Sequence, residues 1–524
     1  MFETLSSRIK GTLEVMKTLM RSVAVHFEDS LVAEKATGRN KPTEGHLSYS
    51  QPRTRAEGSG NSPSYDTQVV YNLNGIRGCS NQKEATIDEV LQHSCKEADY
   101  VNDLAARCLS GELSTRQLEA IANSCTQAVK VRREVLKRKV SVAKGREATD
   151  NDFLDHCPLT GFEYAHAVGV CCENMIGHIT IPVGIAGPLL IDGIEVFLPI
   201  ATTEGALVAS ICRGCKAANQ AGGVTTELIG DAITRSACLK FPSLEKAYSA
   251  KTWLETSEGH TRMRTAFRQT SKYIVLKEVQ VSIVGELLYP RFVASTGDAM
   301  GMNMISVAVE KALVALQDAG FRDMTILSLS GNTCTDKKPS AMNWVRGRGK
   351  HVVAQARIPS QVIRDVLRTT PATLLELNVV KNLTGSAVAG TLGGFNTHAS
   401  NIVSGVFLAT GQDVAQVVES SNCITTMSEV ETDLLVSVTM PSIEVGTVGG
   451  GTNLPAQASM LELLDVRGTH RLGPGLNARR LARVIAAAVL VGELSTCSAL
   501  ATADLASAHL RLNRKRPSRM NCAT

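Results

Sequence analysis

The sequence predicts a mixed α/β protein in which helical and strand-like segments alternate. Residues 304–318 place their apolar side chains on one stripe at helical spacing. Residues 272–292, KYIVLKEVQVSIVGELLYPRF, and the β-branched run 436–438 have strand composition, which suggests antiparallel elements near the middle of the chain. With 42 glycines in 524 residues and only 4% aromatic residues, the core should consist of small side chains, an interior that often encloses a cofactor.

Composition excludes several classes of protein. The 55 Lys and Arg against 50 Asp and Glu leave a formal charge of +5, which is too small and too dispersed for a dedicated nucleic-acid-binding protein. The 14 cysteines lack paired metal-ligand spacing, so we expect reduced thiols in a cytosol-like compartment and no metal site.

Two uncharged stretches approach the length of a membrane span, but neither has the right content. Residues 174–191 contain Pro182, Pro188 and several glycines, which would break a spanning helix. Residues 382–412 contain Gly, Asn and His398, whose polar groups would be stranded in lipid. We expect neither stretch to cross a membrane.

The chain is expected to begin with an N-terminal segment at 1–84, followed by a helical subdomain at 85–150. The first contains an amphipathic helix over 2–34 and a linker over 36–84 that is rich in Gly, Ser, Pro, Asn and Thr. The second ends in the basic run 130–139, KVRREVLKRK, which we interpret as a solvated helix face rather than an anion site.

Residues 202–210, TTEGALVAS, place Glu204 just before an apolar helical start. A carboxylic acid held in an apolar turn keeps its proton near neutral pH and can donate it. The alternative is that Glu204 only caps the following helix.

Residues 330–339, SGNTCTDKKP, follow the apolar run 325–329, so Lys337 and Lys338 lie just beyond a predicted strand end. An ammonium group there could stabilise an oxyanion that develops on a carbonyl. The alternative is an exposed Asp-Lys-Lys turn.

Four further segments are ambiguous when each is taken alone. GDAMGMNM at 297–304 sets two glycines before the striped helix, where amides can bind a phosphate. GPGLNA at 473–478 fits a dinucleotide fingerprint, but no strand precedes it, so we treat the match as false. Asp413 in GQDVAQ is either a functional acid or a helix cap, and His509 near the C-terminus is either an acid or a surface residue.

Together, and in this order, these segments resemble 3-hydroxy-3-methylglutaryl-coenzyme A (HMG-CoA) reductase of the eukaryotic type. The resemblance covers about 85–515 and includes ENMIGHITIPVGIAGPL at 173–189, KNLTGSAVAGTLGGFNTHASNIV at 381–403 and TVGGGTNLP at 447–455. It implies NADPH-dependent, four-electron reduction of the HMG-CoA thioester to mevalonate, an isoprenoid and sterol precursor, through a hemithioacetal and an aldehyde.

The family's four catalytic residues match Glu204, Lys337, Asp413 and His509. The resemblance implies that Lys337 stabilises the substrate oxygen, Glu204 protonates it, His509 protonates the coenzyme A thiolate, and Asp413 tunes Glu204 and Lys337. The matching substrate contacts are Ser210, Arg213, Arg235, Ser330, Asp336, Lys338 and Lys381. The matching cofactor contacts are Asp298, Met300, Gly301, Met302 and Asn303, with Ser271 and Lys272 at the 2′-phosphate of NADPH.

The implied fold is that of HMG-CoA reductase rather than a Rossmann fold. It has a large substrate and catalytic domain at 151–236 and 328–515 around a central helix, a small ferredoxin-like NADP-binding domain inserted at 237–327, and a basic tail at 516–524. The family's active sites form between subunits, so we expect a homo-oligomer, as a dimer of dimers.

Three positions depart from the family pattern. Cys212 replaces an expected Asn, His178 replaces an expected Tyr, and Lys515 replaces the regulatory Ser, with Ser518 three residues on. We therefore expect the usual phosphorylation control to be lost. The family's membrane-spanning region is absent from this chain, so we expect a cytosolic protein, or one at the cytosolic face of the endoplasmic reticulum if a longer protein carries it.

Two rival functions stay open. One is a coenzyme A or metabolite sensor that has lost turnover, although the four matching catalytic positions argue against it. The other is an anion or nucleic-acid binder led by the tail RLNRKRPSR at 511–519, for which binding would depend steeply on salt.

Overall fold

The computed structural model describes residues 87–144 and 153–502. Contacts divide the chain into two units, 1–84 and 85–524. The first unit lies outside the described residues, as do the predicted helix at 2–34, His509 and the tail at 516–524.

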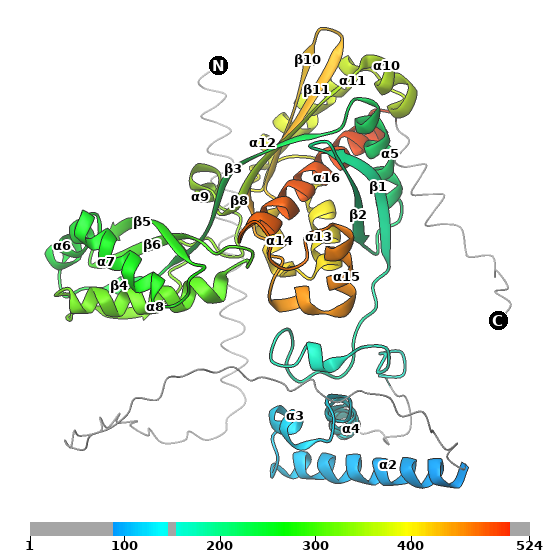
Figure 1. The fold of residues 1–524 in the computed structure, drawn as a ribbon, viewed down its shortest axis with the longest axis vertical. Coiled ribbons are helices and arrows are strands. Elements are labelled where there is room, and N and C mark those ends of the chain that lie inside the picture. Colours follow the sequence, from blue (N-terminus) through cyan, green and yellow to red (C-terminus); the bar gives the residue numbers. More distant parts are fainter. Residues whose placement is uncertain (1–86, 145–152, 503–524) are drawn as a thin grey trace, which may run out of the picture. The chain divides into compact units, whose positions relative to one another are not determined.

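The second unit contains a mixture of helices and strands (Figure 1). Its helices are α2 (Ile87–Ser110), α3 (Leu118–Ile121), α4 (Cys125–Lys144), α5 (Leu207–Gln220), α6 (Leu244–Leu254), α7 (Ser257–Arg268), α8 (Met302–Asp318), α9 (Ala341–Arg346), α10 (Ser360–Val362), α11 (Pro371–Leu377), α12 (Ser386–Ala389), α13 (Ala399–Thr410), α14 (Val417–Ser420), α15 (Pro455–Leu463) and α16 (Leu476–Ala501). Its strands are β1 (Val183–Ile191), β2 (Ile194–Ala201), β3 (Thr225–Ser236), β4 (Cys238–Lys240), β5 (Val275–Val284), β6 (Leu287–Ser295), β7 (Thr325–Ser328), β8 (Gly349–Ile358), β9 (Gly394–Phe395), β10 (Cys423–Val430) and β11 (Asp433–Ile443).

One long strand links two parts of a nine-stranded sheet. The strand order is β7-β4-β6-β3-β8-β11-β10-β9, with β5 paired to β6 outside this path. The N-terminal half of β3 pairs with β8 and its C-terminal half pairs with β6, both antiparallel. The predicted mixed α/β class is confirmed, and the predicted strand-like run at 272–292 forms the antiparallel hairpin β5–β6.

The two parts of the sheet have separate hydrophobic cores. The smaller core lies between Ile233 and Met324 and contains the side chains of α6, α7 and α8 packed on β4, β5 and β6. The predicted apolar stripe of α8 is buried throughout, at Ile305, Ala308, Val309, Ala312, Leu313 and Leu316. The boundaries assigned to an inserted cofactor domain, 237–327, stay a prediction.

Helix α16 passes through the larger core, with α5 beside its C-terminal half (Figure 1). Among the described residues, α16 is the helix long and apolar enough to cross a membrane, but 89% of its most apolar window is buried inside the protein. Small residues allow this packing, because a Cβ atom at Gly214 of α5 would overlap the carbonyl group of Val491 in α16.

The basic run at 130–139 forms the middle of α4 and is not a uniformly solvated face. Arg132 is 4% exposed and its guanidinium group pairs with Glu119 at 2.5 Å. Arg133 donates hydrogen bonds to the carbonyl oxygens of Leu154 and Cys157. The interpretation as a solvated face is therefore wrong for these two residues, which bond α4 to neighbouring segments of the same chain.

Candidate active site

A cleft of about 1000 Å³ opens where the start of α8 approaches loops of the larger core. Glycines let its backbone walls come close together: a Cβ atom at Gly446 would overlap the Met300 amide nitrogen. The predicted site residues that line the cleft are Arg235, Met300, Gly301, Met302, Asn303, Asp336, Lys337 and Asp413.

Lys337 and Asp413 form an ion pair in this cleft. The Lys337 Nζ atom lies 2.9 Å from Asp413 Oδ2, and both side chains are partly exposed. Asp413 also caps the short 3₁₀ turn Val414–Gln416 by accepting a hydrogen bond from the Ala415 amide at 3.0 Å, so it is both a helix cap and a cleft residue. The hydrogen bond to Asp413 raises the pKa of Lys337, which keeps its ammonium group charged at neutral pH.

Residues 330–339 form the Lys337 loop, which contains three further predicted residues: Ser330, Asp336 and Lys338. Arg235 Nη1 is 4.0 Å from Asp336 Oδ2, and both residues line the cleft. The exposed Lys338 donates to the backbone oxygen of Asp336 at 3.1 Å. Ser330 does not line the cleft, and its Oγ atom lies 3.6 Å from Cys334 Sγ.

The start of α8 forms the opposite wall of the cleft. Gly301 caps the helix with φ 102°, a conformation that glycine adopts without strain, and Met302 and Asn303 follow in the first turn. First-turn amides have no partner within their own helix and attract anions. The predicted phosphate-binding character of GDAMGMNM is therefore compatible with the geometry.

Asp298 has a different position from its neighbours in that segment. It is 3% exposed, and its two carboxylate oxygens accept hydrogen bonds from the amides of Gly475 at 2.8 Å and Ala478 at 3.0 Å. Asp298 thus caps α16, and two amides of GPGLNA, those of Gly475 and Ala478, are bonded to protein rather than free for a phosphate. This arrangement supports the rejection of GPGLNA as a dinucleotide fingerprint.

Ser271 and Lys272 lie at the surface between α7 and β5, outside the cleft lining. Ser271 Oγ accepts a hydrogen bond from the Tyr273 amide at 3.2 Å. The Lys272 ammonium group lies 5.1 Å from the centre of the Tyr273 ring. Their assignment to a 2′-phosphate stays a prediction.

A second group of predicted residues surrounds the C-terminal half of α16. Ser210 and Arg213 of α5 hydrogen-bond Ser495, with Arg213 donating to the Ser495 backbone oxygen at 2.6 Å. Lys381 is half-buried in the π-helical turn Asn378–Gly385, and the next residue, Asn382, contacts Cys497 of α16. These residues do not line the cleft.

Glu204 lies in the turn that leads into α5. Its side chain is exposed rather than enclosed by apolar residues, so the expected apolar environment is absent from the described part of this chain. Its backbone amide donates to Thr202 Oγ1 at 3.0 Å, and no ion pair with Lys337 or a hydrogen bond to Asp413 is found among the described residues.

Helix α16 separates the two groups. Asp298 binds the amide of Ala478 beside the cleft wall, whereas Arg213 binds Ser495. At about 1.5 Å of rise per residue, these two positions on α16 are about 25 Å apart. A single chain therefore carries the predicted residues as two groups, one in the cleft and one near the end of α16.

Several buried charged residues near the site were not among the residues predicted from the sequence. Arg348, Glu419 and Glu444 form a buried cluster behind the Lys337 loop. Glu493 of α16 is fully buried and accepts hydrogen bonds from the backbone amides of Thr397 and His398, each at 2.7 Å. Each could have been found as an isolated charged residue within an apolar or small-residue stretch. Such a charge needs a partner when it is buried, so it indicates a buried polar contact.

The sequence model of one protein family, hydroxymethylglutaryl-coenzyme A reductase, matches residues 128–514. The chain belongs to this family. A 3-hydroxy-3-methylglutaryl-coenzyme A reductase of Schizosaccharomyces pombe is 53% identical over 407 residues, which cover 78% of this chain and 38% of that protein. A reductase of Penicillium citrinum is 50% identical over 432 residues, 82% of this chain and 37% of that protein. The chain thus spans about two fifths of the length of these relatives.

A solved structure supports the hydroxymethylglutaryl-coenzyme A reductase fold. The class II 3-hydroxy-3-methylglutaryl-CoA reductase of Streptococcus pneumoniae, solved bound to NADPH in open conformations, matches with a TM-score of 0.52. It is 18% identical, and the match covers 74% of this chain and all of that one. The predicted family and fold are therefore both confirmed.

Two of the departures from the family pattern can be placed. Cys212 is half-buried on α5, next to Arg213, and its Sγ atom lies 4.0 Å from the Ile185 backbone oxygen. His178 stacks on Phe162 with ring centres 5.3 Å apart. Lys515 and Ser518 lie outside the described residues.

Proposed function

We propose that this chain catalyses the NADPH-dependent reduction of HMG-CoA to mevalonate and free coenzyme A. The observation that carries the proposal is the Lys337–Asp413 pair, 2.9 Å apart, in a cleft whose other wall is the start of α8. A fixed ammonium group facing a ligand-sized cleft suits a reaction that develops negative charge on a carbonyl oxygen. Family membership and the identity to fungal reductases support the same substrate.

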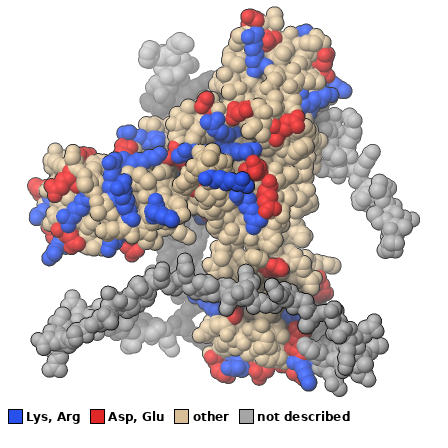
Figure 2. Space-filling model, in the orientation of Figure 1, with Lys and Arg blue, Asp and Glu red and all other residues tan. Residues whose placement is uncertain are grey.

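The cleft suits a dinucleotide in size and lining. Its volume of about 1000 Å³ lies at the upper end of small-molecule pockets. The first-turn amides at Met302 and Asn303 suit a diphosphate, and the glycines at 449–451 permit close backbone approach. Basic side chains gather over the domain around α7 (Figure 2), where Arg264, Arg268 and Lys277 line a hollow. These features favour a cofactor with several phosphates, as NADPH has.

Within this proposal, the cations of the site anchor the substrate. Arg235 in the cleft lining and the nearby Lys338, with Arg213 and Lys381 at the second group, would pair with the free carboxylate and the phosphates of HMG-CoA. Ser210, Ser330 and Asp336 would supply hydrogen bonds, and Asp298 would support the cofactor wall from its position at the start of α16.

NADPH, when bound, supplies the hydride ion for each of two reductions. In the first, the thioester carbonyl becomes a tetrahedral alkoxide, and Lys337 stabilises its oxygen. Cleavage of the carbon–sulfur bond then gives an aldehyde, and His509 protonates the departing coenzyme A thiolate. In the second, the aldehyde becomes an alkoxide that Lys337 holds and Glu204 protonates to give the alcohol.

We infer that two copies of the chain complete each site. Lys337 and Asp413 lie in the cleft of one copy, and the exposed Glu204 would come from the other, with Ser210 and Arg213 beside it. The exposure of Glu204 and the separation of the two groups along α16 support this arrangement, which an isologous dimer would repeat twice. A dimer of dimers would contain four sites.

The free cysteines support a reducing compartment. All twelve cysteines in the described part of the chain are unpaired. We propose that the catalytic portion works in the cytosol or at the cytosolic face of the endoplasmic reticulum.

The test is the loss of NADPH absorbance on addition of HMG-CoA, with released thiol measured in parallel. The expected result is two nucleotides consumed for each thiol released, and loss of both signals in Lys337→Ala. A folded, oligomeric wild-type protein that consumes no NADPH would contradict the proposal and favour a sensor that binds HMG-CoA without turnover.

A further inference from the structure

Arg348 precedes β8 and is buried behind the Lys337 loop, with 1% of its surface exposed. Each nitrogen of its guanidinium group has a partner. Nε donates to Thr234 Oγ1 at 3.1 Å, and Nη2 contacts Asp336 Oδ1 and Met302 Sδ, each at 3.0 Å. Nη1 contacts Glu444 and donates to Glu419 Oε1 at 2.7 Å. Arg348 thus joins the Lys337 loop, α14 and the first residue of α8.

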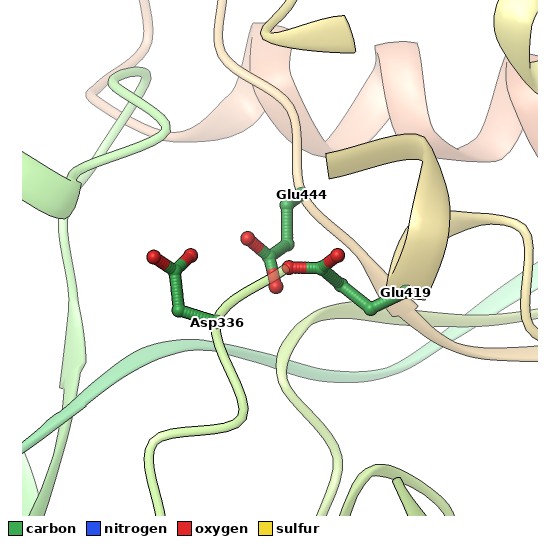
Figure 3. A group of neighbouring side chains, drawn as sticks. All are labelled: Asp336, Glu419 and Glu444. Carbon is green, nitrogen blue, oxygen red and sulfur yellow. The ribbon is translucent and has the colours of Figure 1, made fainter. Parts of the chain in front are cut away.

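Three carboxyl groups from separate segments lie together (Figure 3), and each of them contacts the Arg348 guanidinium group. Oxygens of Asp336, Glu419 and Glu444 lie within 4.8 Å of one another. Burial raises the pKa of Glu419, and raises that of Glu444 well above its usual range. Arg348 supplies the cation that the ionised members of this buried cluster require.

Glu419 also holds the backbone of the Lys337 loop. Its Oε1 atom accepts a hydrogen bond from the Lys337 backbone amide at 2.8 Å. Lys337 has φ 56°, and Thr335 and Asn332 in the same loop have φ 62° and 63°. Residues with side chains are uncommon in this left-handed region, and such a backbone persists only where its surroundings hold it.

Among the described residues, the other side-chain bonds to the backbone of this loop end on residues other than Lys337. Thr234 Oγ1 donates to the Cys334 backbone oxygen at 2.8 Å, and Thr335 Oγ1 donates to Asn343 at 2.6 Å. Both bonds end before Lys337. Asn343 Nδ2 donates to the Lys338 backbone oxygen at 3.3 Å. The Glu419 carboxylate is the buried group that bonds the Lys337 amide, and it is itself held by Arg348.

We propose that Glu419, fixed by Arg348, is a positioning residue that sets the direction in which the Lys337 ammonium group points into the cleft. The expected effects on kcat rest on the proposed reductase function. Glu419 and Arg348 are buried and do not line the cleft, so they act through the loop backbone. A misplacement of about 1 Å at a reacting group can cost about 100-fold in rate.

The kinetic test compares Glu419→Ala with Glu419→Gln. Glu419→Ala removes the acceptor of the Lys337 amide and should lower kcat about 100-fold, with little change in the KM for NADPH. The Gln side chain keeps an amide oxygen in the same place, so Glu419→Gln should retain kcat within about tenfold of wild type. Equal losses in the two variants would overturn the acceptor role.

Two readouts separate positioning from general destabilisation. If Lys337 swings away from Asp413 in Glu419→Ala, its raised pKa falls, and the alkaline limb of the kcat profile moves to lower pH. Amide hydrogen exchange should also speed up at residues 330–339 relative to the rest of the protein. The exchange result needs no turnover, so it tests positioning even if the reductase proposal fails.

Glu119→Ala is the matched control, since it removes a carboxylate that pairs with the buried Arg132 in the α3–α4 region. It should not move the alkaline limb or exchange at 330–339. Unchanged exchange in a folded Glu419→Ala protein, or kcat within about threefold of wild type, would overturn the proposal.

Discussion

The two groups of predicted site residues differ in how their own chain supports them. The loop around Lys337 is tied to β3, α9 and α14 and to Arg348, and its ammonium group is paired with Asp413. The turn that carries Glu204 leaves its side chain exposed, and the Glu204 backbone amide donates a hydrogen bond to Thr202 Oγ1. One chain therefore fixes Lys337, the residue proposed to stabilise the oxyanion, whereas Glu204, the proposed proton donor, lacks the enclosed surroundings that a general acid requires.

Among changes to the two groups, Glu204→Gln should have the largest effect. We expect a fall in kcat of about 10²- to 10⁴-fold, because the amide cannot donate the proton that completes the alcohol. Because the Glu204 side chain is exposed, thermal stability and NADPH binding should match wild type. Near-normal turnover would show that Glu204 is not the proton donor.

Lys337→Ala should act on the other half with a slightly smaller effect. Loss of one oxyanion-stabilising group costs about 10²- to 10³-fold in kcat. The measurement is steady-state NADPH oxidation, with bound-nucleotide fluorescence as the control for an intact cofactor wall. A variant that raises KM alone would indicate that Lys337 only binds substrate.

Gly214→Ala tests whether close packing of α5 on α16 positions the second group of residues. It leaves the polar residues of that group unchanged. The new methyl group would overlap the Val491 carbonyl and push α5, with Ser210 and Arg213, away from α16. We expect a loss of about 1–3 kcal/mol in the free energy of unfolding, measured by urea denaturation. Gly230→Ala is the control, because its Cβ would make an ordinary contact 3.6 Å from the His351 Cβ.

Asp413→Asn should have the smallest effect of these changes, a shift in the pH dependence of kcat. The bond to Asp413 raises the pKa of Lys337, so the ammonium group and the activity it supports persist to higher pH. Asn removes the charge, the pKa of Lys337 falls, and the alkaline limb of kcat should move to lower pH. A limb that stays in place would mean that Lys337 does not control it.

The parts of the fold that are local in sequence were predictable. The stripe of α8 and the hairpin β5–β6 both follow from periodicity within 20 residues or so. Helix α16 was expected only as a central helix of the resembled family. Its run of Ala, Val, Ser and Cys has no polar face, since it is buried on almost every side.

The parts of the site that depend on distant partners were not predictable from one sequence. Lys337 and Asp413 could be brought together only through the family resemblance, because their separation in sequence is 76 residues (413 − 337). Arg348 meets Glu419 and Glu444 across separations of 71 and 96 residues, and no local pattern marks those pairs. Glu204 is exposed in a single chain. The surface proposed to cover it belongs to a second copy, and no pattern in the sequence indicates which surface that is.

The most direct test of the two-copy site is complementation between inactive variants. Lys337→Ala and Glu204→Gln proteins would be mixed, dissociated, reassociated and assayed for NADPH oxidation. If each site takes Lys337 from one copy and Glu204 from the other, random pairing restores one intact site in each mixed dimer, or about a quarter of wild-type activity. Activity that stays at the level of the separate variants, despite confirmed exchange of subunits, would contradict the account and place both residues in a site made by one chain.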